Sequence, residues 1–291
     1  MSVEKNIIMV VNPISGDLDK AVFTSAAEEF AQKEGLNFIL FETTGEDDLS
    51  KIRKLYDTHT PQRVIVAGGD GTIKLVAEAL EEHNVILGIL PAGSANGLSV
   101  DLGFPKTLEE NLEIAFNNHH TELDIICING HRSMHLSDIG LNAELIKNYE
   151  NSTIRGKLGY ALQTVNTLTD DPVEFNAVIT ANNQTIETDA RMIVIANSQK
   201  YGTGVVINPI GSMDDGKFEI VVLKNLDLIL FGKIVSGNMP LDSDNVEIIS
   251  TDQAVITTDI PVHFQIDGEY IGEITELDIK IMHRQMKVAV P

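Results

Sequence analysis

Residues 68–72 read Gly-Gly-Asp-Gly-Thr and come directly after an uninterrupted apolar run, Val64–Ala67. Apolar residues then recur at helical spacing, at Ile73, Val76, Ala77 and Leu80. This order predicts a buried strand, a tight glycine turn and the first turn of a helix. Glycine can adopt positive φ there and leaves space beside the backbone for a ligand. Because the N–H groups at a helix start attract phosphate, the stretch predicts a phosphate-binding turn.

Asp70 is the unusual residue of this turn. A carboxylate repels phosphate unless it acts through a metal ion or through hydrogen bonds to hydroxyl groups. The turn is not a P-loop, because no Lys-Ser/Thr follows at the required spacing, and it is not a GxGxxG sequence. An ordinary strand–helix turn with an aspartate cap is the alternative interpretation at this point.

Polar residues also follow the other apolar runs of the first half. Asn12 and Ser15 precede Gly16, and Thr43 is the first of two threonines after the next run. Ser94 lies in the string Pro-Ala-Gly-Ser-Ala-Asn-Gly-Leu, where it can cap the following helix and present its hydroxyl and N–H to a phosphate. Each turn taken alone is more typical of ordinary loop and cap chemistry. Only their occurrence together in one chain indicates a binding site.

Two acidic turns occur in the second half of the chain. Residues 214–216 read Asp-Asp-Gly and stand just before an apolar run that begins at Phe218. Asp267 and Gly268 end another apolar run, and Glu269 follows them. Both sequences are typical β-turns, so turn formation alone would explain them.

In this order the strings resemble those of the diacylglycerol-kinase-like lipid kinases, whose superfamily also includes the NAD kinases and phosphofructokinases. The turn at 68–72 matches the family's GGDGT, and residues 12–16 are similar to its N-P-x-S/A-G. Residues 91–96 are similar to P-x-G-T/S-x-N, with serine at the variable position. Residues 208–218 resemble the family's magnesium loop, and 267–269 match its D-G-E motif. The resemblance covers essentially the whole chain.

This resemblance implies an ATP-dependent lipid kinase that transfers the γ-phosphoryl group to a diacylglycerol- or sphingoid-type hydroxyl with magnesium. It implies that Asp267 is the catalytic base, which would accept the proton of the attacking hydroxyl. It implies that Asp215 and the carbonyl of Lys217 bind a structural magnesium ion, and oxygen ligands suit that hard cation. The ATP-binding residues it implies are Asn12, Ser15, Thr43, Gly68, Gly69, Asp70, Gly71, Thr72 and Ser94.

The chain departs from the family pattern at two places. Lys74-Leu75 replaces the Asn-Glu that usually follows GGDGT, and Ser212 stands where some members carry another carboxylate. These departures leave open a catalytically weak nucleotide-binding regulator, and an NAD kinase-like enzyme acting on a soluble ribose hydroxyl is a second alternative. The string at 91–98 and the 267–269 motif disfavour the NAD kinase. Lys147, Arg155 and Lys157 resemble a segment that could contact an anionic headgroup, or they form a solvated charged turn.

Composition limits the class of protein. The chain has 291 residues, of which 43% are hydrophobic and 22% charged, and its formal net charge is −22. These are globular values for one large or two ordinary domains. The acidic excess argues against nucleic acid as a partner and against a polybasic membrane anchor. The single cysteine, Cys127, excludes an intrachain disulfide and favours a reducing compartment.

The first half alternates predicted strands and helices. Strands are expected at 7–11, 37–41, 64–67 and 86–90, and helices at 17–33, 47–56, after the glycine turn, near 95–101 and at 107–117. This βα order predicts a doubly wound parallel sheet that binds its ligand at the carboxyl ends of the strands. We therefore expect an α/β ATP-binding domain over residues 1–124.

The pattern changes after about residue 124. Short predicted strands follow at 125–128, 134–137, 173–181, 185–196, 217–223, 246–250, 254–258, 262–266, 276–282 and 287–290. Helical patches are expected at 143–149 and 157–167. We therefore predict an antiparallel β-sandwich, lipid-binding domain over residues 125–291. In the family the last strand often returns to the first domain, and the active site is expected in a cleft between the two.

No apolar run approaches 18 residues, which predicts no transmembrane segment and a cytoplasmic location. The expected partner is a lipid substrate at a membrane surface, which implies peripheral association. A homodimer is a further expectation.

Overall fold

The computed structural model describes residues 5–16, 18–94, 96–141, 143, 173–201, 205–225 and 244–291. The predicted helix at 157–167 and nearly all of that at 143–149 lie outside the described residues, as do Lys147, Arg155 and Lys157. Backbone contacts divide the chain into two units. The first contains Met1–Leu123 and Arg284–Pro291, and the second contains Asp124–His283.

The first unit is built on a parallel sheet. Its strands are β1 (Asn6–Val11), β2 (Asn37–Glu42), β3 (Arg63–Gly68) and β4 (Ile86–Pro91), in the spatial order β4-β3-β1-β2. The end of a later strand, β14, adds to this sheet, because Lys287 and Val288 pair in parallel with the first residues of β4. Apolar side chains fill β1 and β3 almost without interruption, as expected for strands buried on both faces.

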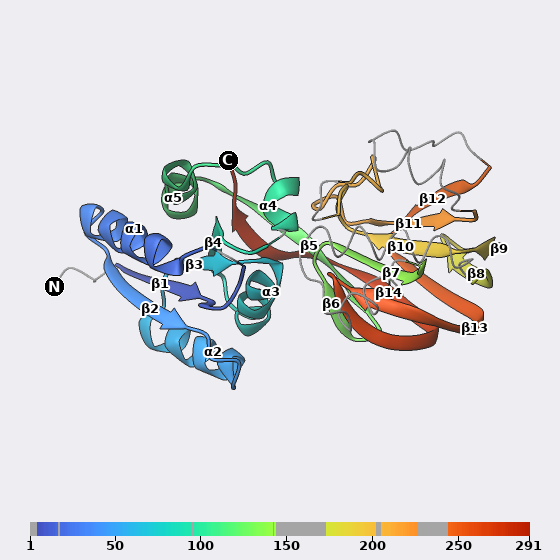
Figure 1. Cartoon of the computed structure of the whole chain (residues 1–291), viewed down its shortest axis with the longest axis horizontal. Coiled ribbons are helices and arrows are strands. Elements are labelled where there is room, and N and C mark those ends of the chain that lie inside the picture. The colour runs from blue at the N-terminus through green and yellow to red at the C-terminus, as the bar shows by residue number, and fades with distance from the viewer. Residues whose placement is uncertain are drawn as a thin grey trace. The chain divides into compact units, whose positions relative to one another are not determined.

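Helices cover both faces of this sheet. They are α1 (Lys20–Lys33), α2 (Asp48–His59), α3 (Asp70–Ala79), the short α4 (Gly97–Asp101) and α5 (Leu108–Asn117). Figure 1 shows α1 and α5 on one face, and α2 and α3 on the other. On the α1/α5 side, Ala27 and Ala31 pack with strand residues and with Phe116. Helix α1 begins at Lys20, later than predicted, because the carboxylate of Asp19 caps it by accepting from Ala21 N.

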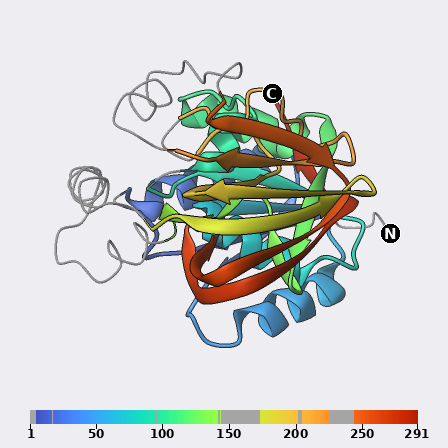
Figure 2. The ribbon, with the colours of Figure 1, turned by 90° about the vertical axis from the view of Figure 1, so that its right-hand side faces the viewer.

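The second unit is an antiparallel β structure. Its strands are β5 (His120–Ile128), β6 (His131–Ser133), β7 (Leu136–Gly140), β8 (Phe175–Ala181), β9 (Gln184–Ala190), β10 (Met192–Ala196), β11 (Phe218–Leu223), β12 (Val246–Thr251), β13 (Gln253–Ile266) and β14 (Glu269–Ala289). The order β12-β11-β10-β7-β13-β14 runs through its main sheet, and β8 pairs with both β13 and β9. In Figure 2 these strands can be followed by colour, from green β7 through yellow β9 to red β14. The predicted fold class, a parallel α/β unit followed by an antiparallel β unit, is confirmed.

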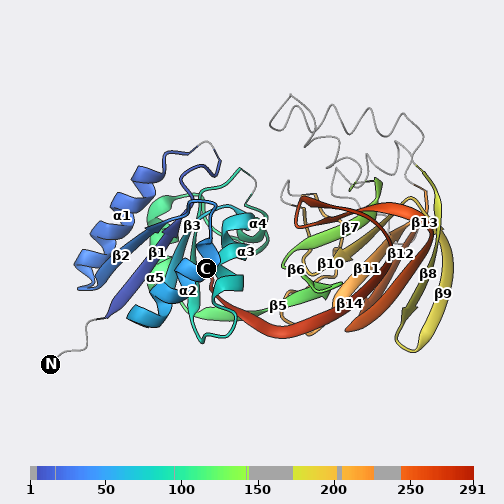
Figure 3. The same cartoon turned by 90° about the horizontal axis from the view of Figure 1, so that it is seen from below.

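Several predicted strand limits in this unit are wrong. The hairpin at Asn129-Gly130 pairs β5 with β6, whereas the predicted partner 134–137 consists of two residues between strands and the first two residues of β7. The single strand predicted at 185–196 is two strands, β9 and β10. The pairs 254–258 with 262–266, and 276–282 with 287–290, are single long strands, β13 and β14 (Figure 3).

The cause in β13 is local. Residues near Pro261, which suggest a turn in the sequence, lie in an irregularity of the β13–β14 register between Thr257 and Val262. A bulge of this kind accommodates a proline, which lacks the N–H that a regular ladder requires, without ending the strand. Among the described residues, no helix has the length and apolar character needed to cross a bilayer.

Candidate active site

Three turns at the carboxyl edge of the parallel sheet are packed together through glycines. A Cβ atom on Gly93 would lie 2.3 Å from the Cα of Gly69, so only glycine permits this approach of the turns after β4 and β3. Gly16, after β1, has φ +61°, and a Cβ there would lie 2.9 Å from the carbonyl carbon of Gly93. The turns after β1, β3 and β4 therefore form one continuous backbone surface, as the doubly wound sheet predicts.

The glycines of residues 68–72 serve this packing rather than an unusual backbone conformation. The positive-φ glycines of the chain do not include Gly68, Gly69 or Gly71, so the expected use of positive φ is wrong. A Cβ on Gly68 would lie 2.4 Å from the side-chain oxygen of Thr72, and one on Gly69 would lie 3.2 Å from Gly93. Gly71 differs, because a Cβ there would meet nothing within 4 Å. Its open side is where a ligand could reach the backbone.

The first turn of α3 leaves amides available for that ligand. The N–H groups of Thr72 and Ile73 donate to the carbonyl of Gly69, at 2.9 and 3.1 Å. Helix geometry provides no intrahelical carbonyl for the preceding amides, those of Asp70 and Gly71. Together with the helix dipole they make the start of α3 suited to an anion, as predicted from the sequence.

The carboxylate of Asp70 is held by the neighbouring turn. It accepts hydrogen bonds from Gly97 N at 2.7 Å and from Leu98 N at 3.0 Å, and so caps α4. The cap of its own helix, α3, is Gly69. Asp70 thus connects the turn after β3 to the helix that follows β4, and a helix N-terminus partly compensates its charge. Its role toward a metal or nucleotide stays a prediction.

This contact changes the interpretation of Ser94. Ser94 was expected to cap α4, but the N-cap residue is Asn96 and the side-chain bonds to the helix amides come from Asp70. Asn96 instead closes the turn itself, accepting from Gly93 N at 2.8 Å and donating to Gly93 O at 2.9 Å. Ser94 is exposed beside these residues, and its role as a ligand contact stays a prediction.

The turns after β1 and β2 adjoin the same edge. Asn12 N donates to the carbonyl of Ala67 in β3, and Thr43 N donates to Val11 in β1 at 2.9 Å. Asn12 Oδ1 accepts from Ile14 N, and the hydroxyl of Ser15 donates to Asn12 O at 3.1 Å. The structure therefore places Asn12, Ser15 and Thr43 beside the glycine turns.

A buried carboxylate distinguishes the two threonines after β2. Asp48 accepts from Thr44 N at 3.0 Å, from the Thr44 hydroxyl at 3.1 Å and from Gly45 N at 2.7 Å. Burial alone would raise the pKa of Asp48, but these donors and the nearby Lys51 together hold that pKa below its ordinary value. Since Thr44 is used in this loop, Thr43 is the better candidate for a ligand contact.

Asp267 lies in a two-residue turn of the second unit, between β13 and β14. Asp267 has φ 50° and Gly268 has φ 87°, the conformation favoured for tight β-hairpins. The Asp267 carboxylate accepts from the hydroxyl of Ser133 at 3.1 Å and from the backbone amides of Met134 and His135 at 3.0 and 2.9 Å. These three donors fix the direction of the carboxylate in a half-buried position.

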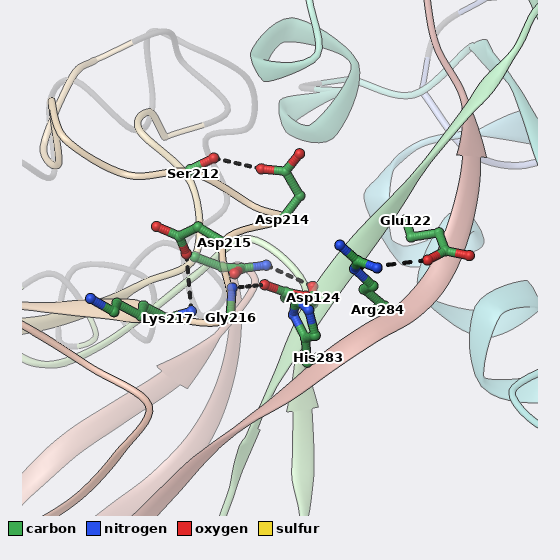
Figure 4. Close-up of polar contacts among 10 residues, drawn as sticks. Glu122, Asp124, Ser212, Asp214, Asp215, Gly216, Lys217, His283 and Arg284 are labelled. Carbon is green, nitrogen blue, oxygen red and sulfur yellow. Dashed lines mark hydrogen bonds and ion pairs between the residues drawn. The ribbon is translucent and has the colours of Figure 1, made fainter.

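The acidic loop at 212–217 belongs to the same unit and is shown in Figure 4. Asp215 Oδ1 accepts from Lys217 N at 3.0 Å, and Asp214 accepts from the hydroxyl of Ser212 at 2.6 Å. The two carboxylates point in different directions (Figure 4). Within the described ranges no group of three His, Cys, Asp or Glu side chains could hold a metal. Asp214 and Asp215 are both exposed, and the carboxylate of Asp215 and the Lys217 carbonyl stay the predicted magnesium donors.

A buried aspartate anchors this loop. Asp124 accepts from Gly216 N and from His283 Nδ1, each at 2.7 Å, and its own N–H donates to Met213 O at 2.7 Å. Gly216 has φ +78°, so the turn requires glycine there (Figure 4). Sequence reasoning missed Asp124, although a charged residue at the start of an apolar run was a signal that could have identified it.

Asn197 joins the two acidic turns and was also missed. Its side-chain amide is buried and donates to Asp124 O at 2.8 Å and to Met134 O at 2.9 Å. Met134 in turn helps to hold Asp267. An asparagine directly after the apolar run Met192–Ala196 was the signal for such a role. The second unit therefore ties the loop of Asp215 and the turn of Asp267 to one framework.

Comparison with known proteins agrees with this arrangement. The domain family described as "Diacylglycerol kinase catalytic domain" matches residues 6–128, and that described as "YegS C-terminal NAD kinase beta sandwich-like domain" matches residues 138–290. The chain belongs to the diacylglycerol kinase-like lipid kinase family. The resemblance inferred from the motifs is confirmed. The first match covers the α/β part of the chain and the second covers its β part.

Individual relatives cover most of the chain. "Probable lipid kinase YegS" of Escherichia fergusonii is 31% identical over 240 residues, 78% of this chain and 78% of the relative. The protein of the same name from Salmonella dublin is 26% identical over 244 residues, 79% of this chain and 78% of the relative. A crystal structure from Bacillus anthracis str. Sterne, described as a diacylglycerol kinase, superposes with a TM-score of 0.76 at 20% identity, covering 100% of this chain and 98% of that one. That structure shows the shared fold, and the roles of single residues stay predictions.

Proposed function

We propose that this chain is an ATP-dependent lipid kinase that transfers the γ-phosphoryl group of ATP to the hydroxyl group of a diacylglycerol- or sphingoid-type lipid. The observation that carries the proposal is the match to both parts of the lipid kinase family, over residues 6–128 and 138–290. The geometry of the two units supports it, because each unit supplies one half of the chemistry.

ATP would be bound by the first unit. The amides at the start of α3, on the open side of Gly71, would receive a phosphate group, and Ser94 would add its hydroxyl. Asn12, Ser15 and Thr43 would contact the nucleoside. The interlocked glycines keep this seat rigid, so binding need not order it first.

The second unit would supply the base, Asp267. The oxygen of the lipid hydroxyl forms a bond to the γ-phosphorus while the bond from that phosphorus to the bridging β–γ oxygen breaks. The hydroxyl proton goes to the carboxylate of Asp267, and ADP leaves. Three hydrogen bonds from Ser133, Met134 and His135 hold that carboxylate in one orientation, which favours proton transfer by positioning.

Magnesium would be held by Asp215 and the Lys217 carbonyl. One carboxylate and one carbonyl fit an ion that retains several water ligands, as magnesium commonly does, and do not form a cage made by protein alone. When bound, the ion supplies positive charge to the loop. Asp215 keeps its second oxygen for it, since Oδ1 already accepts from Lys217 N.

The lipid would be presented by a membrane, with the chain associated peripherally in the cytoplasm and as a homodimer. The net charge of −22 favours a neutral lipid surface over an anionic one.

The test is incubation with γ-labelled ATP, magnesium and a panel of diacylglycerol, monoacylglycerol, ceramide and a sphingoid base, with NAD as a soluble acceptor. Label in one lipid is the expected result. Asp267→Asn should bind ATP as tightly as the wild type and transfer label only at a small residual rate, whereas retained turnover would exclude Asp267 as the base. Formation of NADP would instead identify an NAD kinase, and ATP binding without transfer to any lipid would indicate a regulator.

A further inference from the structure

Two buried polar side chains, Gln265 and Asp138, lie in the strands next to the turn that contains Asp267. Gln265 of β13 and Asp138 of β7 stand opposite each other in the sheet register, and their exposed fractions are 1% and 0%. On the same face of the sheet, Val194 of β10 is opposite Asp138 and Leu136 lies two residues before it, and both are buried apolar residues. Placing an amide and a carboxylate among them costs free energy unless both are well hydrogen-bonded.

The hydrogen bonds of Gln265 lead to the Asp267 turn. Its Nε2 donates to Asp138 Oδ2, and its Oε1 accepts from Gly268 N at 2.7 Å. The hydroxyl of Tyr201 donates to the same oxygen of Asp138 at 3.1 Å. A carboxylate oxygen only accepts and a backbone N–H only donates, so the amide of Gln265 has one satisfactory orientation.

This amide therefore connects the core of the sheet to the second residue of the turn. Gly268 has φ 87°, and it follows Asp267 directly, so a shift of the Gly268 peptide would rotate the Asp267 backbone and its carboxylate. Asp267 N is itself fixed by the carbonyl of Leu136 at 3.0 Å. The N–H groups of both turn residues are thus hydrogen-bonded, that of Gly268 to the Gln265 side chain and that of Asp267 to the Leu136 carbonyl.

We propose that Gln265 is a positioning residue for the predicted catalytic base, and that Asp138 and Tyr201 fix the orientation of its amide. This inference rests on the proposed function for its kinetic consequence, but its structural content can be tested without any substrate. The step it controls is the alignment of the Asp267 carboxylate with the hydroxyl proton, where small displacements reduce kcat strongly.

The first experiment measures hydrogen exchange of the Gly268 amide by NMR in the full chain. Gln265→Met has nearly the same shape but cannot accept from Gly268 N, so exchange of that amide should be about tenfold faster. The matched control is Thr251→Val, since Thr251 is also 1% exposed and its hydroxyl donates locally, to the carbonyl of Gln253 at 2.8 Å where β12 passes into β13. Unchanged exchange at Gly268 in Gln265→Met, or an equal increase in the control, would overturn the proposal.

A second variant guards against loss of folding. Gln265→Asn keeps an amide but is one methylene shorter, so it cannot reach Asp138 and Gly268 together. It should also accelerate exchange at Gly268. Since neither measurement uses ATP or lipid, a positive result with no lipid phosphorylated would reject the proposed function and keep the inference about the turn.

The kinetic experiment separates positioning from general destabilisation. In an active chain, Gln265→Met should lower kcat roughly 10- to 100-fold with little change in the KM for ATP. In the Asp267→Asn background the same substitution should have no further effect on the residual rate. An equal loss of kcat in both backgrounds would show that Gln265 acts through stability alone.

Discussion

Replacing Gly93 and Gly71 separately by alanine tests whether the glycines of the candidate ATP seat serve packing or ligand access. In Gly93→Ala the new Cβ would lie 2.3 Å from Gly69 Cα, 2.8 Å from Gly69 N and 2.9 Å from Asn96 Oδ1. Two of these atoms are backbone, so the turns after β3 and β4 must separate. Overpacking of this kind costs about 1–3 kcal/mol. For a chain of this size we expect the melting temperature of the first unit to fall by roughly 2–10 °C.

Gly71→Ala should behave in the opposite way. The new Cβ meets nothing within 4 Å, and Gly71 lies in the first turn of α3 without a positive φ, so alanine fits the backbone. Alanine is a better helix former, which predicts unchanged or slightly higher stability, by up to about 1 kcal/mol. The same Cβ would occupy the open side of the turn and should weaken ATP binding roughly tenfold or more, since a displaced phosphate loses charge-assisted hydrogen bonds.

Calorimetry with and without ATP measures both effects on the same samples. Gly93→Ala should melt earlier even without nucleotide, whereas Gly71→Ala should melt normally and lose the stabilisation that ATP gives the wild type. Equal stability of Gly93→Ala and wild type would refute the packing argument. Normal ATP stabilisation of Gly71→Ala would show that phosphate does not bind at the start of α3.

Three further substitutions test other contacts. Asp70→Asn leaves one of the amides of Gly97 and Leu98 facing an NH2 group. We therefore expect urea titration to show a loss of about 1–3 kcal/mol in unfolding free energy. Wild-type stability would show that Asp70 does not cap α4. Asp48→Asn should cost a similar amount, about 1–3 kcal/mol, at pH 7. Because the pKa of Asp48 is lowered in the folded chain, this contribution is complete above its ordinary value of 3.8 and is lost as pH falls through the lowered pKa. Urea titrations at several pH values should therefore show the two proteins converging in acid, and a constant difference would refute this. Asp215→Asn should raise the magnesium concentration for half-maximal activity about tenfold with ATP affinity unchanged. An unaltered magnesium dependence would show that Asp215 does not bind the ion.

The sequence was sufficient for the parallel sheet and for the turns at its carboxyl edge. Continuous apolar runs such as Val64–Ala67 can be satisfied only in strands buried on both faces, and a glycine turn followed by a helical pattern has few alternatives. The contacts among the turns could not be predicted. Gly16, Gly69 and Gly93 are distant in sequence, and nothing local indicates that they touch.

The second unit was less predictable because strand ends there are not marked by local sequence. Pro261 signals a break, but the antiparallel partner β14 accommodates it as a bulge, so β13 continues. The opposite error occurs at Ala190–Met192, where a run without turn residues is divided into β9 and β10 because its two parts pair with different strands. Register with a distant partner decides both cases.

The two carboxylates for which chemical roles are predicted, Asp70 and Asp267, show why a structural and a catalytic interpretation need not compete. Asp70 caps a helix and Asp267 forms a hairpin turn, as the simpler interpretation of each sequence predicts. In both, however, backbone amides hold the carboxylate before any substrate arrives. A charged group fixed in this way needs little reorganisation during a reaction, which is the main source of electrostatic catalysis. The turn and the amides around Asp267 are therefore the physical condition under which that residue could act as an efficient base.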